Sequence, residues 1–251
     1  MDIETISSRK NRYIAHLRAL ASDGAYRRQQ GEYLCDGIKL LREALEKGAE
    51  LRSVLWKERA EEIPGLGRLR QYAAPAELFD YASPMKNSPG PVFTLAMPEP
   101  DSKGVIRNAI VLENVQDPGN VGTVLRTARA LGIDAVILLG ACADIYSPKT
   151  ARATMGAVFS QRVIYSDAAG LKRLAEDSGL KLYGAALSQR AEDIRRLDLS
   201  RAVVCVGSEG RGLSRELLAQ CQEEVIIPME KGSESLNAAV AAALIMWEMT
   251  R

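Results

Sequence analysis

Short, continuously apolar runs alternate with segments of helical periodicity throughout the second half of the chain. The runs with strand character are 109–112, 135–139, 162–165, 182–185, 202–206 and 225–227. A strand that is apolar along its whole length is typical of a parallel sheet, because helices cover both faces of such a sheet. The alternation of strands with helices indicates the same architecture. We therefore expect an α/β fold with a parallel sheet over residues 105–251.

The first hundred residues also mix helix-like and strand-like segments. We expect helices over 11–21, 38–46 and 76–81, and strands over 32–35, 51–56 and 92–96. The sequence then becomes rich in proline and has no apolar residue that could anchor it, which is typical of a linker. We predict a smaller α/β domain over residues 1–98, a linker over 99–104 and a second domain over 105–251.

The composition is that of a folded protein with a substantial core. Hydrophobic residues make up 47% of the 251 positions, and 33 Lys and Arg residues nearly balance 32 Asp and Glu residues. This profile excludes a disordered chain. No stretch approaches the roughly 20 apolar residues that a membrane span requires, and the acidic start is unlike a signal peptide. We expect a cytoplasmic protein that does not enter a membrane.

The cysteines and the single histidine offer little for metal binding or nucleophilic catalysis. Cys35, Cys142, Cys205 and Cys221 are far apart and include no Cys-x-x-Cys pair, whereas metal sites need clustered ligands. His16 lies among basic residues near the N-terminus. We expect buried thiols and no metal site, and mechanisms of the Ser-His-Asp or Cys-His type have almost no residues to draw on.

Basic residues gather near the N-terminus, where Asp23 is the one acid among them. This basic patch comprises Arg9, Lys10, Arg12, Arg18, Arg27 and Arg28. Such a cluster suits a phosphate backbone, since neutralising phosphates releases counterions. A solvated helix face is the alternative, and the charge pattern alone does not separate the two.

Unusual sequence follows three of the predicted strands, at the carboxyl ends where open parallel sheets bind ligands. The segments contain, in order, Asn120 and Arg126, then Glu209 in a Gly-x-x-Gly-x-Gly loop, then Ser235 and Asn237. Structural roles are open for each: Asn120 and Ser235 as helix N-caps, Arg126 as an exposed cation, and the glycines as a plain turn. A dinucleotide fingerprint is disfavoured, because the Glu209 carboxylate would repel a pyrophosphate.

The three segments in this order resemble the signature motifs of the SpoU (TrmH-like) branch of the SPOUT methyltransferases. The resemblance rests on the spacing of Asn120 and Arg126, on the loop 207–210 and on the run 227–237, and it extends over 105–251. It implies a C-terminal domain with a deep trefoil knot, which composition could not indicate because true knots are rare. It also implies a homodimer with each active site at the interface.

The resemblance further implies a cofactor and a reaction. The cofactor, S-adenosylmethionine, would lie near Leu187, Gly207, Ile227, Ser235 and Leu236. The implied reaction is methyl transfer to a ribose 2'-hydroxyl of RNA. Arg126 would act as general base, or it would grip the adjacent phosphate and stabilise the developing alkoxide, because a guanidinium with a pKa above about 12 is a poor base. The residues that would orient Arg126 and the ribose are Asn120, Glu209, Ser235 and Asn237.

The N-terminal part is similar to the RNA-binding domain, related to a ribosomal protein, that often precedes this catalytic domain. The similarity lies in residues 26–34 and Gly37, whereas Cys35 and Asp36 replace the Val-Glu pair that is commoner in the family. The basic patch then becomes a phosphate-contacting surface. The expected RNA-binding residues are Arg9, Lys10, Arg12, Arg27, Arg28, Lys149 and Arg152.

The separate N-terminal domain favours ribosomal RNA, and within it the large-subunit rRNA, over tRNA as the substrate. A non-catalytic RNA-binding or ribosome-assembly protein of the same fold is a second reading, although Asn120, Arg126, Glu209, Ser235 and Asn237 are all present. An unrelated nucleotide-dependent enzyme is a third. Binding assays with S-adenosylmethionine and NAD separate the third reading from the first two.

Overall fold

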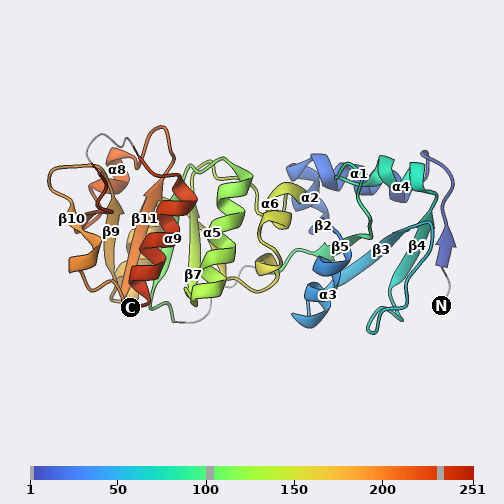
Figure 1. The fold of residues 1–251 in the computed structure, drawn as a ribbon, viewed down its shortest axis with the longest axis horizontal. Helices are drawn as coiled ribbons and strands as arrows, with labels where there is room; N and C mark the ends of the chain where they lie inside the picture. Colours follow the sequence, from blue (N-terminus) through green and yellow to red (C-terminus); the bar gives the residue numbers. More distant parts are fainter. Residues whose placement is uncertain (1–2, 100–104, 231–234) are drawn as a thin grey trace. The chain divides into compact units, whose positions relative to one another are not determined.

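The computed structural model describes residues 3–99, 105–230 and 235–251, and it divides into two compact units (Figure 1). The first unit contains the described residues up to Glu99 together with Asp144–Phe159. The second unit contains the remaining described residues up to Ala143 and from Ser160 to Arg251. None of the helices in the described part of the chain is long and apolar enough to span a membrane.

The second unit is built on a parallel sheet, as the apolar runs predict. Its strand order is β10-β12-β9-β11-β6-β7-β8, and each pair of neighbouring strands is parallel. The strands are β6 (Ala109–Glu113), β7 (Ala135–Leu139), β8 (Val163–Ser166), β9 (Lys181–Ala185), β10 (Glu192–Asp193), β11 (Ala202–Gly207) and β12 (Glu223–Ile226). The expected α/β fold with a parallel sheet is confirmed, with a short β10 that its polar sequence did not indicate.

Helices cover both faces of this sheet, which explains why its central strands are apolar throughout. The helices are α5 (Pro118–Leu131), α7 (Ala168–Asp177), α8 (Arg215–Leu218) and α9 (Ala238–Met249), with a 3-10 turn η2 (Ile194–Arg196). Val111 and Ile137 on one face pack with Leu171 of α7 and Leu217 of α8. On the other face α5 and α9 lie side by side (Figure 1).

The first unit has a mixed five-stranded sheet of order β1-β4-β3-β5-β2. Its strands are β1 (Ile3–Thr5), β2 (Glu32–Asp36), β3 (Leu51–Lys57), β4 (Arg70–Ala74) and β5 (Val92–Ala96), and its helices α1 (Arg12–Ser22), α2 (Gly24–Gln30), α3 (Ile38–Glu46) and α4 (Ala76–Ala82). Strand β4 is parallel to β1 and β3, whereas β5 is antiparallel to β3 and β2. Sequence periodicity missed β1, α2 and β4.

A segment from the second half of the chain belongs to the first unit. Residues 144–159, with α6 (Pro148–Ala153) and the 3-10 turn η1 (Ala157–Phe159), cluster with the N-terminal residues. Ala151 is buried in the same core as Tyr33, and the Tyr146 ring lies 4.7 Å from that of Tyr33. The predicted range 105–251 is therefore interrupted, because this segment finds its apolar partners on β2. Within the predicted linker, residues 100–104 lie outside the described residues.

Candidate active site

A cavity of 510 Å³ in the second unit opens at the carboxyl ends of β9, β11 and β12. Its wall includes apolar side chains of α9, among them Ala238, Ala241 and Ile245. Alanine at the first two of these positions leaves room that a larger side chain would fill. The cavity is lined by every residue expected beside a cofactor, namely Leu187, Gly207, Ile227, Ser235 and Leu236. Arg211 also lines it, a residue that the sequence analysis did not select.

The glycine-rich loop after β11 folds back tightly on itself. A Cβ at Gly207 would lie 2.1 Å from the backbone carbon of Gly212, so no other residue fits without moving the loop. Gly212 has φ +64° and donates its N–H to the Ser208 carbonyl at 2.8 Å, which closes the turn. Gly207 is needed because of this close approach of the backbone, and Gly212 because glycine adopts the left-handed region without strain.

Glu113, at the end of β6, holds the C-terminal end of this loop in place through Ser214. Its buried carboxylate accepts the Ser214 N–H and the Ser214 hydroxyl, each at 2.7 Å. The Ser214 hydroxyl in turn caps α8 by accepting the Leu217 N–H at 3.1 Å. Sequence reasoning missed Glu113, although an acid that ends a fully apolar strand was the available signal, since a buried carboxylate requires partners.

Three of the expected catalytic residues meet at the rim of the cavity. The Glu209 Oε1 atom accepts the side-chain N–H of Asn120 at 3.0 Å, the side-chain N–H of Asn237 at 2.5 Å and the Ala238 backbone N–H at 3.3 Å. Asn237 also donates to the Asn120 Oδ1 atom at 3.0 Å. We call Asn120, Glu209 and Asn237 the amide–carboxylate cluster; its members come from three segments far apart in the sequence.

The helix starts differ from the predicted ones in a way that frees Asn120. Asp117 caps α5 by accepting the Asn120 N–H at 2.9 Å, so Asn120 lies inside the first turn. Asn237, not Ser235, caps α9, because its Oδ1 accepts the N–H groups of Ala239 and Val240. The Asn237 oxygen is thus committed to the helix, and its amide nitrogen is turned toward Glu209.

Arg126 and Ser235 stand apart from the amide–carboxylate cluster. Arg126 is exposed on α5, and no hydrogen bond or ion pair of its side chain occurs among the described residues. Ser235 is exposed and lines the cavity. An exposed guanidinium without a protein partner keeps its five N–H donors free for an anion.

Residues 107–247 match the model of the SpoU rRNA methylase family. The chain belongs to this family. It is 33% identical, over 100% of its own length and 94% of the relative, to a protein of Synechocystis sp. that is named an uncharacterized tRNA/rRNA methyltransferase. It is 28% identical, over 98% of its length and 99% of the relative, to the 23S rRNA (guanosine(2553)-2'-O)-methyltransferase RlmP of Bacillus subtilis.

A solved structure agrees with this assignment. An AdoMet-bound rRNA methyltransferase from Sinorhizobium meliloti superimposes with a TM-score of 0.87 at 25% identity, covering 98% of this chain and 97% of that chain. Both compact units of this SpoU protein therefore have counterparts in a protein whose crystal structure contains AdoMet.

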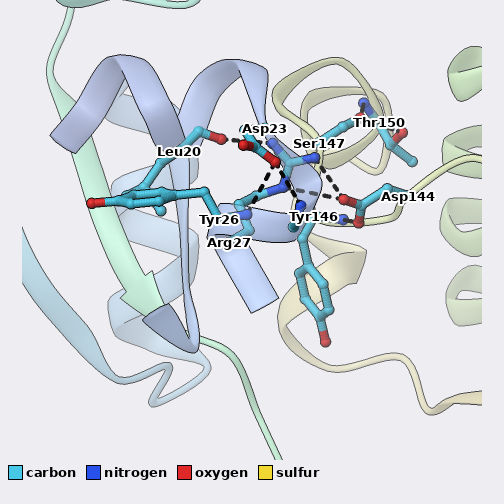
Figure 2. Close-up of polar contacts among 9 residues, drawn as sticks. Leu20, Asp23, Tyr26, Arg27, Asp144, Tyr146, Ser147 and Thr150 are labelled. Atoms are coloured by element: carbon cyan, nitrogen blue, oxygen red, sulfur yellow. Dashed lines mark hydrogen bonds and ion pairs between the residues drawn. The ribbon is translucent and has the colours of Figure 1, made fainter. Parts of the chain in front are cut away.

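One residue of the expected RNA-binding surface of this SpoU protein is buried. The Arg27 side chain points from α2 to Asp144 and is 5% exposed (Figure 2). Its Nε and Nη2 atoms donate to Asp144 Oδ2 at 3.1 and 2.6 Å, and its Nη1 donates to the Leu20 carbonyl at 2.6 Å. The expectation that Arg27 contacts RNA is wrong, because its donors are taken up inside the first unit.

The other expected RNA-binding residues are exposed. Arg9 is paired with Glu77 at 2.9 Å and lies over the Tyr81 ring at 4.7 Å. The remaining exposed cations are Lys10, Arg12, Arg28, Lys149 and Arg152. Exposure leaves these side chains able to meet a phosphate, and a pair as exposed as that of Arg9 contributes little to stability.

The thiols and the histidine take structural positions. Cys35 and Cys205 are buried, and burial raises the pKa of the Cys35 thiol, which keeps it protonated. His16 contacts the Tyr26 hydroxyl at 2.9 Å and the Glu32 carboxylate at 3.2 Å. No group of three or more potential metal ligands occurs in the part of the chain that the structure describes.

Proposed function

We propose that this protein transfers a methyl group from S-adenosylmethionine to a ribose 2'-hydroxyl of ribosomal RNA, and specifically of the large subunit. The observation that carries the proposal is the amide–carboxylate cluster at the mouth of a cavity of 510 Å³. The relative from Bacillus subtilis bears the name of a 23S rRNA 2'-O-methyltransferase, which supports this substrate class.

The cavity suits the proposed cofactor. Its volume lies within the roughly 300–1,000 Å³ typical of small-molecule sites, and its walls are mainly apolar with a few polar groups. When bound, S-adenosylmethionine supplies an electrophilic methyl group on a positively charged sulfur. Backbone near Leu187, Gly207, Ile227 and Leu236 would hold the cofactor, since the Gly207 turn presents main chain directly to the cavity.

Glu209 is the group best placed to orient the ribose. Its Oε1 atom accepts three donors, whereas no hydrogen bond to Oε2 is found among the described residues. An ionised carboxylate oxygen only accepts hydrogen bonds, so Oε2 is suited to a ribose hydroxyl. Asn120 and Asn237 fix the carboxylate in one orientation, and such fixed alignment lowers the barrier to transfer. Ser235 would add a hydroxyl at the same rim.

Arg126 is assigned to the RNA phosphate next to the reacting ribose. A guanidinium stays charged at neutral pH and can hold a phosphate with two parallel hydrogen bonds. Its exposure on α5 supports contact with an incoming ligand rather than with the protein interior. From that position Arg126 would also stabilise negative charge that develops on the attacking oxygen.

A homodimer, a trefoil knot and a cytoplasmic location belong to the same proposal. Val240, Leu244 and Trp247 are 48%, 42% and 57% exposed and follow one another along one face of α9, which supports a second copy as the covering partner. The trefoil knot rests on the resemblance of the second unit to the SPOUT methyltransferases. A ribosomal RNA substrate supports a cytoplasmic location.

Parallel methylation assays test the proposal. The purified protein is incubated with radiolabelled S-adenosylmethionine and either unmodified rRNA or unmodified tRNA, and label is counted in each RNA. We expect label in large-subunit rRNA alone. Label in tRNA alone would show that rRNA is not the substrate. Absence of label from naked RNA and from assembled ribosomal particles would contradict the enzymatic function.

A further inference from the structure

A second cavity, of 680 Å³, lies within the first unit. It is formed by the C-terminal half of α1, by the turn that follows α4 and by the first residues of α6. Three cations line it, Arg18, Lys149 and Arg152, and the lining contains no carboxylate. We call this cavity the basic groove. Asp36 accepts the hydroxyl of the lining residue Ser83 at 2.8 Å and offsets part of the charge of Arg152. Three cations against this one carboxylate still leave the concave site with a net positive charge, which favours an anionic ligand.

Arg18 is held in position by a residue of the same groove. Its guanidinium donates to the Tyr81 carbonyl at 2.7 Å and lies over the Tyr81 ring at 4.0 Å. One N–H group is engaged in that bond, so others remain for a ligand. A cation fixed in advance loses less conformational entropy on binding than a free surface side chain.

Arg27 and Asp144 place the other two cations in the groove. Asp144 begins the segment 144–159, and its Oδ1 accepts the Tyr146 N–H at 2.9 Å while its Oδ2 accepts Arg27 (Figure 2). Ser147 then caps α6 by accepting the Thr150 N–H at 3.3 Å. The ion pair of Arg27 with Asp144 thus anchors the segment whose helix carries Lys149 and Arg152. This role explains why Arg27 is buried although it belongs to the basic patch.

We infer that the basic groove binds the phosphate of an unpaired nucleotide of the RNA substrate. The inference rests on the proposed function for the identity of the ligand as RNA. It assigns one shared ligand to Arg18, a member of the basic patch, and to Lys149 and Arg152 of α6. The groove has the volume of a site for one small molecule. A splayed nucleotide from a loop fits such a site, whereas stacked bases of a duplex do not.

Removal of the three charges tests the inference. Arg18→Gln, Lys149→Gln and Arg152→Gln are combined, and binding is measured over a range of salt concentrations with a stem-loop RNA and a fully paired duplex of the same length. We expect roughly tenfold weaker binding of the stem-loop and a salt slope smaller by about 0.7, since one single-strand phosphate contact contributes about 0.7. Duplex affinity should change much less.

A matched variant controls for the loss of positive charge in general. Arg59→Gln, Arg68→Gln and Arg70→Gln remove three exposed cations from the connection between β3 and β4 and the start of β4. In Figure 1 that connection is at the opposite end of the first unit from α1. We expect this variant to keep the wild-type salt slope for the stem-loop. Both variants should retain the wild-type melting temperature and affinity for S-adenosylmethionine.

The outcomes separate this inference from the proposed function. If the wild type methylates rRNA and the groove variant keeps the affinity, the salt slope and the KM for RNA, the groove assignment is wrong and the proposed function stands. If the wild type methylates no RNA but binds the stem-loop, and the groove variant loses that binding, the groove assignment stands and the proposed function is wrong. Equal losses for the stem-loop and the duplex would also overturn the unpaired nucleotide as ligand.

Discussion

At the scale of single residues, the candidate site depends on how the two ends of one amide are used. Asn237 caps α9 with its oxygen and donates to Glu209 and Asn120 with its nitrogen. The oxygen contribution is a matter of helix stability, whereas the nitrogen contribution concerns the orientation of the carboxylate. Substitutions that keep one end and change the other can therefore separate stability from activity.

We predict that Asn237→Ser and Asn237→Asp differ in activity more than in stability. Both residues are good N-caps, so the melting temperature should stay near that of the wild type. The free energy of unfolding should change by less than about 1 kcal/mol. Serine removes the amide donor, and aspartate places a second carboxylate against Glu209. We expect methyl transfer to fall at least roughly tenfold in Asn237→Ser, the loss of about 1.4 kcal/mol, and further in Asn237→Asp.

Steady-state kinetics with a cofactor-binding titration check this order. The kcat should fall in both variants while the affinity for S-adenosylmethionine changes little, because the cavity lining is otherwise intact. Equal activities of Asn237→Asp and the wild type would contradict an orienting role for the amide nitrogen.

Sequence patterns selected the three residues that form the amide–carboxylate cluster, but they did not indicate which contacts these residues make. Asn120, Glu209 and Asn237 were selected from strand ends, and the structure places them within hydrogen-bonding distance. The same patterns placed Arg27 on the surface, because a charge count does not reveal that Asp144, more than a hundred positions away, provides an acidic partner. Partners that are distant in the sequence leave no periodic signal.

At the scale of secondary-structure elements, amphipathic segments were predictable and polar ones were not. Helix α3 has the predicted bounds, with Leu41 buried and Gly48 following its end at φ +67°. Strand β4 was missed because its sequence, Arg-Gln-Tyr-Ala-Ala, has no apolar run. Helix α2 was missed because it follows α1 directly, with Asp23 alone between them as its N-cap.

The docking of the segment 144–159 gives an element-scale prediction. Arg27→Met retains much of the side chain's apolar volume but leaves Asp144 without its buried partner. We expect the segment to open more easily by about 2 kcal/mol, which corresponds to roughly thirtyfold faster amide exchange wherever local opening controls it. Hydrogen exchange followed by mass spectrometry of peptides from 144–159 measures this change.

Arg28→Met is the matched control for that substitution. Arg28 is the exposed neighbour of Arg27 on the same helix, and its replacement should leave exchange in 144–159 as in the wild type. Equal exchange in Arg27→Met and the wild type would show that the ion pair does not hold the segment.

At the scale of the whole molecule, the exposed apolar face of α9 is the feature that a single chain leaves unexplained. Val240, Leu244 and Trp247 share this face, whereas Ile245 and Met246 of the same helix are buried. Because α9 also borders the cavity, a partner that covers the exposed face would lie beside the active site. The sequence of α9 is apolar on all sides, which predicts a buried helix. It does not show whether other parts of the same chain or a second chain cover the helix.

We predict that Leu244→Asp converts a dimer into a monomer. A carboxylate placed at an apolar interface would lose its hydration, and the dissociation constant should rise at least roughly a hundredfold, or about 2.7 kcal/mol. Val105→Asp is the control, since Val105 is exposed but lies outside α9. Sedimentation equilibrium gives the masses; a monomeric wild type, or a Leu244→Asp protein that stays dimeric, would contradict the predicted interface.

The division of the chain into two units explains how binding and chemistry are distributed. The proposed cofactor cavity and the amide–carboxylate cluster lie in the second unit, and the basic groove lies in the first. Sequence composition indicated two domains but could not assign the segment 144–159 to the first, because its apolar residues suit either core. Only packing against Tyr33 decides the matter.

The position of the transferred methyl group tests the central claim most directly. Ribosomal RNA labelled by the wild-type protein is hydrolysed with alkali, which cleaves only where a free 2'-hydroxyl can attack the adjacent phosphate. We predict that the label remains in alkali-resistant dinucleotides, and that Arg126→Ala and Glu209→Gln lose it while retaining affinity for S-adenosylmethionine. Label released in mononucleotides would place the methyl group on a base and contradict ribose 2'-O-methylation by this site.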